Sequence, residues 1–108
     1  MDIERRISAR NAPSYSPGEL EDLRVTRVHF RERYLFCLLS DGNMLCVPLT
    51  ISSVLVAASP QARYQWKIAD DGKAVLWFTK GMGVVSERLT LADILGHPDA
   101  RITKVGGE

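Results

Sequence analysis

Apolar and polar residues alternate from residue 25 to residue 31, in the sequence VTRVHFR. This period of two predicts a half-buried strand that turns Thr26, Val28 and Phe30 inward and a row of basic side chains outward. The next two runs, YLFCLLS and NMLCVPL, are apolar at nearly every position, which is typical either of central strands covered on both faces or of a strongly curved sheet. Turn residues separate the runs, so we expect consecutive hairpins. Pro48 cannot donate a ladder hydrogen bond and marks the end of the third strand.

Short helices are predicted after these strands. Thr50 is a suitable N-cap for a helix over the sequence ISSVLVAA, and the pair Ser59-Pro60 begins a second short helix through QARYQ. The sequence TLADILG predicts a last helix, in which Thr90 and Asp93 occupy the positions of a capping box.

A second hairpin is predicted over YQWKIADDGKAVLWF, with its turn at Asp71-Gly72. We expect one more short strand around Val84 and Val85. Together the elements predict an α+β fold, a small mixed or antiparallel sheet built from hairpins with short helices packed on it.

One domain is expected over residues 22–96. The stretch NAPSYSPGE makes residues 1–21 a polar N-terminal extension, in which Ile3 and Ile7 could hold a short helical turn. Residues 97–108 are expected to be a loose C-terminal tail.

The composition of the 108 residues is that of an ordinary globular domain, with 14 Lys and Arg against 13 Asp and Glu. This balance argues against an extended nucleic-acid surface but leaves room for a local basic patch. Most of the cations are Arg, which favours fork-like pairing with carboxylates or phosphates. Without a run of about 20 apolar residues or a signal peptide, we expect a cytoplasmic protein with no membrane contact.

Cys37 and Cys46 lie at nearly equal distances from the Asp41-Gly42 turn. A two-residue loop would place the thiols opposite each other, close enough for a cross-strand disulfide, whereas a three-residue loop would separate them. Because the neighbouring residues are apolar, we interpret both cysteines as small core residues rather than as a reactive pair.

No arrangement of residues is typical of a catalytic, cofactor or metal site, so we expect a protein that is not an enzyme and binds no cofactor. The two histidines lack the spacing of metal ligands, and the glycines of GMG lack the helix and lysine of a phosphate-binding loop.

The most suggestive surface feature is a basic stripe. Its residues are Arg24, Arg27, His29, Arg31 and Arg33. Such charge most often keeps a strand soluble; the alternative is a contact surface for an acidic partner or a phosphate backbone.

The segments LLSDGNMLCVPLT, SPQARYQW and VLWF together resemble the bacterial family called domain of unknown function 2442, over about residues 22–96. The residues that carry the resemblance are Ser40, Asp41, Gly42, Val47, Pro48, Leu49, Ser59, Pro60, Arg63, Trp66 and Trp77. The resemblance implies a compact α+β fold, no assigned activity and regulatory or toxin-related partners. The acidic stretch that follows the last tryptophan in many members is replaced here by FTKGMGVV.

Two functions follow as expectations. The first is a protein-interaction or regulatory module, an antitoxin-like partner of another small bacterial protein. The second is a nucleic-acid-binding regulator that uses the basic stripe. The exposed strand near the N-terminus would also allow a homodimer.

Overall fold

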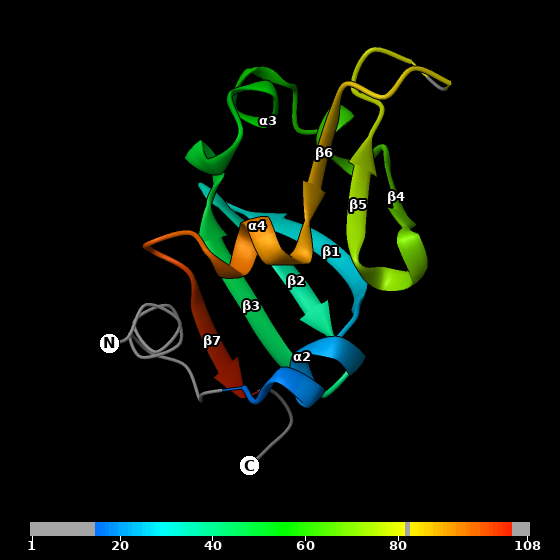
Figure 1. Cartoon of the computed structure of the whole chain (residues 1–108). Coiled ribbons are helices and arrows are strands. Elements are labelled where there is room, and N and C mark those ends of the chain that lie inside the picture. Colours follow the sequence, from blue (N-terminus) through cyan, green and yellow to red (C-terminus); the bar gives the residue numbers. More distant parts are fainter. Residues whose placement is uncertain (1–14, 82, 105–108) are drawn as a thin grey trace.

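The computed structural model describes residues 15–81 and 83–104, which form two antiparallel sheets joined by short helices (Figure 1). The expected α+β class is confirmed, with the strands divided between two sheets. One sheet has the order β1-β2-β3-β7 and the other the order β4-β5-β6. The strands are β1 (Val25–Arg31), β2 (Tyr34–Leu39), β3 (Asn43–Pro48), β4 (Trp66–Ala69), β5 (Ala74–Trp77), β6 (Glu87–Thr90) and β7 (Arg101–Lys104).

Within the described residues, three short α-helices and three 3₁₀ turns accompany the strands. The helices are α2 (Pro17–Asp22), α3 (Ser53–Ala57) and α4 (Leu91–Leu95), and the turns are η1 (Leu49–Ile51), η2 (Ala62–Tyr64) and η3 (Asp70–Gly72). Helix α2 lies within the segment expected as a polar extension. The helical turn expected around Ile3 and Ile7 lies outside the described residues.

Strand β1 departs from the expected alternation. Its register with β2 shifts between Val25 and Arg27, so the strand contains a β-bulge. Val25 and Val28 are therefore the buried residues, and Thr26 is exposed, with its hydroxyl donating to the carbonyl of Leu38 at 3.1 Å. The prediction that Thr26 faces inward was wrong because a bulge adds one residue and reverses the alternation.

The helix starts follow local capping chemistry. Thr90 and Asp93 form the expected capping box of α4, which is confirmed. Helix α3 begins later than expected, because the N-cap is Ser52, whose hydroxyl accepts from the amide of Leu55 at 3.1 Å, and Thr50 lies in η1.

Two expectations for the second half of the chain need correction. The third strand of the second sheet is β6, which begins after Val84 and Val85 and leaves both valines exposed in the preceding loop. The expected loose tail contains β7, which pairs with β3 and buries Ala100 and Ile102.

The two sheets share one hydrophobic core. In Figure 1, α4 lies in front of the four-stranded sheet, and its Leu91 and Ile94 belong to the same buried cluster as the strands. The cluster consists of Leu23, Val25, Val28, Leu35, Cys37, Leu39, Leu45, Val47, Leu49, Leu55, Val75, Trp77, Leu89, Leu91, Ile94, Ala100 and Ile102. Because each sheet contributes one face to this core, the other face of each points outward.

The free edge of β1 is bonded by a side chain. The hydroxyl of Tyr64 accepts from the amide of Phe30 at 3.1 Å and donates to the Phe30 carbonyl at 3.2 Å. The rings of the two residues also meet edge to face, with centroids 5.4 Å apart. Turn η2 is thereby fixed to β1.

The β4–β5 turn holds helix α2 in place. Asp70, Asp71 and Gly72 all have positive φ, which brings Lys73 back toward the N-terminal segment. The Lys73 ammonium donates to the carbonyls of Leu20, Glu21 and Leu23 at 2.7 to 2.9 Å. A cation at this end of a helix satisfies carbonyls that have no partner within the helix.

Gly72 is the position in this turn where a side chain should be least tolerated. It has φ +89°, and an added Cβ would lie 2.5 Å from Cβ of Arg24. We therefore expect Gly72→Ala to lower the free energy of unfolding by about 2–3 kcal/mol, measured by urea denaturation.

Gly42→Ala is the matched control. Gly42 has φ +91° but no atom within 4 Å of an added Cβ, so only the backbone strain of about 1 kcal/mol should appear. Equal losses in the two variants would show that the contact with Arg24 is unimportant.

Candidate binding face

The face of the four-stranded sheet that points away from the core carries an unusual set of side chains. Directly opposed residues of antiparallel strands project to the same side, so the register defines this set. We call it the outer face. It consists of Arg27, His29 and Arg31 of β1, Tyr34, Phe36 and Leu38 of β2, Met44, Cys46 and Pro48 of β3, and Arg101 and Thr103 of β7.

The burial of β2 follows this division. Leu35, Cys37 and Leu39 are buried in the core, whereas Phe36 and Leu38 on the outer face are only half-buried. Tyr34 exposes 43% of its surface. The expectation that this strand is covered on both faces is therefore not met by the described residues.

The structure brings together three of the five residues predicted as a basic stripe. Arg27, His29 and Arg31 share the outer face. Arg24 instead turns to the β4–β5 turn, where Nε donates to the Asp71 carbonyl at 3.0 Å and the terminal nitrogen pairs with its carboxylate at 3.1 Å. Arg33 is exposed in the β1–β2 turn.

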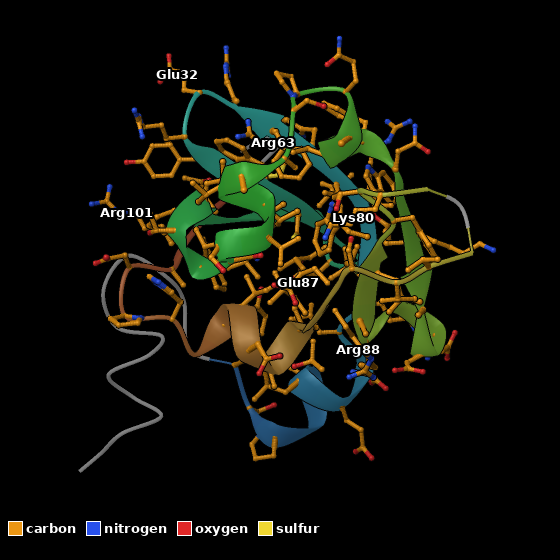
Figure 2. The ribbon with its side chains drawn as sticks, turned by 90° about the horizontal axis from the view of Figure 1, so that it is seen from above. Glu32, Arg63, Lys80, Glu87, Arg88 and Arg101 are labelled. Atoms are coloured by element: carbon orange, nitrogen blue, oxygen red, sulfur yellow. The ribbon has the colours of Figure 1, made fainter. Side chains whose placement is uncertain are left out.

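Arg101 is a further cation of the outer face, and the sequence analysis missed it. It stands opposite Cys46, on the strand that was expected to be a loose tail. Figure 2 shows Arg101 projecting from the side of the molecule, and Glu32 projecting from the tip of the β1–β2 turn. The signal that could have found Arg101 is the alternation of Ala100 and Ile102 with Arg101 and Thr103.

Among the described residues, none on the outer face is acidic. The acids that flank the stripe in the sequence lie outside this face. Glu19, Glu21 and Asp22 belong to α2, and Glu32 lies in the turn at the end of the face. The net charge of the chain is close to zero, but among the described residues the outer face carries only positively charged and uncharged side chains.

Aromatic rings occupy the middle of the outer face. The rings of His29 and Phe36 are stacked, with centroids 4.9 Å apart and planes inclined by 4°. The Tyr34 ring lies 6.5 Å from that of Phe36 and is tilted by 59°. The side chains of two adjacent strands thus form a small aromatic cluster between Arg27 and Arg31.

The two cysteines lie on opposite faces of the sheet. Cys37 pairs with Leu45 and Cys46 with Phe36, because a three-residue loop joins β2 to β3. The direct pairing of the thiols that a two-residue loop predicts does not occur. Burial raises the pKa of the Cys37 thiol to about 12. The pKa of Cys46 is raised by burial as well, and the charge of Arg101 opposes this shift.

Most residues of the family resemblance have structural contacts. The Ser40 hydroxyl accepts from the amide of Arg24 at 2.9 Å. Asp41 accepts from the Tyr15 hydroxyl at 2.7 Å and from the buried side chain of Asn43 at 3.1 Å. Burial and the neighbouring Asp41 raise the pKa of Tyr15 to about 12, although its hydrogen bond with Asn43 acts in the opposite direction. This network joins the chain before α2 to the β2–β3 turn.

The remaining residues of that set fix the helical segment to the second sheet. Nε of Arg63 donates to the carbonyl of Leu55 at 2.9 Å, and the Arg63 carbonyl accepts from the indole of Trp77 at 3.0 Å. Trp66 is the cross-strand partner of Trp77, and Pro60 lies in the turn before η2. Arg63 therefore connects the end of α3 to Trp77 of β5.

Other polar contacts in the described part of the chain support the fold. The Ser52 hydroxyl donates to a carboxylate oxygen of Glu87 at 2.5 Å while it caps α3. Between residues 15 and 104, position 82 excepted, no three His, Cys, Asp or Glu side chains gather as a metal site would require. Within the same residues, no helix is long and apolar enough to cross a membrane.

Comparison with known proteins identified no matching family model, no similar curated protein and no similar solved structure. The resemblance to domain of unknown function 2442 therefore stays an expectation from the sequence.

The different environments of the thiols predict different rates of alkylation. With iodoacetamide near pH 8, Cys46 should be labelled slowly in the native protein, because only its thiolate reacts and its pKa is raised. Cys37 should stay unlabelled until the chain is unfolded, since it is buried and its pKa is about 12.

The Cys37→Ser and Cys46→Ser variants each keep one of the two cysteines. Mass spectrometry of the two variants therefore gives the labelling rate of each thiol separately. Labelling of Cys46 should accelerate as the pH rises above 9. Rapid labelling of Cys37 in the native protein at pH 8 would contradict its placement in the core.

Proposed function

We propose that this protein binds nucleic acid through the outer face of its four-stranded sheet. The observation that carries the proposal is the gathering of Arg27, Arg31 and Arg101 with His29 on one face without a carboxylate. A guanidinium group can bind a phosphate through two parallel hydrogen bonds, and such phosphate contacts position proteins on nucleic acid.

The spacing of these cations suits an extended anionic chain. Arg27 and Arg31 are four residues apart on one strand, which is about 13 Å. Arg101 lies three strands away from β1, which is about 14 Å. The cations therefore surround the half-buried apolar centre of the face, and a bound backbone could cross it while contacting more than one of them.

Three other cations of the described residues are already bonded within the fold. Arg24 pairs with Asp71, and Arg88 pairs with Asp70, both at the second sheet. Lys73 is bonded to three carbonyls at the end of α2. These cations already have internal partners, and no such partner is recorded for Arg27, Arg31 or Arg101 among the described residues.

The protein-interaction or antitoxin-like module expected from the sequence resemblance is the competing proposal. An acidic protein surface could also pair with these arginines. The half-exposed aromatic cluster favours nucleic acid, because bases offer planar partners for it.

Charge reversal tests the proposal directly. Fluorescence anisotropy with a labelled single strand of about 12 nucleotides should show an affinity that falls with salt, with a log–log slope of about −2 to −3 for three or four phosphate contacts. Arg27→Glu and Arg31→Glu should each weaken binding at least about ten-fold and make the slope shallower.

Lys67→Glu is the matched control, since Lys67 is exposed on β4 and the change in net charge is the same. The affinity of Lys67→Glu for the single strand should stay within about two-fold of the wild-type value. The small change comes from the weaker long-range attraction of a less positive protein, which salt largely screens. Wild-type affinity in both arginine variants would refute the proposal. An absence of nucleic-acid binding at about 50 mM salt would also refute it. If the wild-type protein then bound an acidic protein and both arginine variants did not, the competing module would be favoured.

A further inference from the structure

We infer that the outer face takes single-stranded rather than duplex nucleic acid, and that one base lies over Cys46, between the Phe36 ring and the Arg101 guanidinium. This inference rests on the proposed function and deepens it. Phosphate binding involves only the cations of the face. The inference adds base stacking on Phe36 and a space for the base above the small side chain of Cys46.

The middle row of the face provides the position. From β1 to β7 its residues are His29, Phe36, Cys46 and Arg101, each opposite the next in the register. Cys46 is the smallest side chain of this row, so the surface is lowest there. Phe36 and Arg101 start from strands about 9–10 Å apart, which leaves room for one planar ring between two planar side chains.

The Phe36 ring has one face already engaged. His29 stacks on it with nearly parallel planes, which supports the ring in its orientation. His29 and Cys46 flank Phe36 from opposite neighbouring strands, so the second face of the ring is directed toward Cys46. A base stacked there would continue the stack that His29 begins, and the guanidinium of Arg101 would cover its other side by cation–π contact.

Tyr34 extends the same platform along β2. Its ring is tilted to that of Phe36 and 43% of its surface is exposed, so an adjacent base could contact it. Arg27 and Arg31 lie on the neighbouring strand on either side of His29, where they would receive the phosphates on either side of the stacked bases.

A duplex cannot use this stacking arrangement. Its bases are already paired and stacked on one another, so their planar faces are not available to Phe36 and Arg101. Preference for a single strand therefore measures the contribution of stacking, whereas salt dependence measures the contribution of the cations.

Phe36→Leu is the decisive variant, because it keeps an apolar side chain but removes the ring. We expect it to weaken binding of a single strand about ten-fold without changing the salt slope, and to leave weak duplex binding unchanged. Wild-type protein should bind the single strand at least about ten-fold more tightly than a duplex of the same sequence.

Protection of Cys46 gives a second readout that needs no substitution. A saturating single strand of about 12 nucleotides should slow iodoacetamide labelling of Cys46 at least about five-fold, whereas a bound duplex should not. Thermal unfolding of Phe36→Leu, followed by circular dichroism, shows whether a loss of affinity comes from a loss of fold.

The outcomes separate this inference from the proposed function. Equal affinity for single strand and duplex, no effect of Phe36→Leu and an unprotected Cys46 would overturn the inference, while a loss of affinity in Arg27→Glu would keep the proposed function. Preference for the single strand without protection of Cys46 would overturn the position of the base. Failure of every nucleic acid to bind would remove both.

Discussion

Burial of Trp77 between the two sheets is the interaction on which the other parts of the structure depend. Each sheet is apolar on one face, and that face must be buried against another element, so each sheet serves as the cover of the other. The indole is fully buried, meets the Phe30 ring of the first sheet, and donates to the carbonyl of Arg63. Arg63 in turn bonds the last carbonyls of α3. One side chain thus connects both sheets and the helical segment between them.

This shared core determines which surface is left for a partner. The inner face of the four-stranded sheet is occupied by the second sheet and by α4, and the acids of the chain are concentrated on α2 and on the turn of the second sheet. The remaining face combines cations with half-buried rings. Its residues contribute little to the core, so the proposed binding surface and the core use largely different side chains of the same strands.

The sequence was sufficient for the fold class, both hairpins and the capping of α4, because alternation, turn residues and caps act over a few residues. It was insufficient for register. Whether the β2–β3 loop has two or three residues changes the face of Cys46, and a single bulge reverses Thr26. The candidate face was only partly predictable for the same reason. Aromatic residues at positions 34 and 36 of the sequence indicate burial. Only the pairing of the strands shows that these rings lie on the same face as Arg101.

The Tyr64 hydroxyl, which bonds both backbone groups of Phe30, has a consequence for how the protein avoids aggregation. An open strand edge is a template on which another chain can pair. Here one phenol occupies both backbone groups of Phe30, at the edge of β1 that borders the second sheet. Because this cover is a single side chain from a 3₁₀ turn, a modification of that oxygen would free the two groups for pairing with another strand.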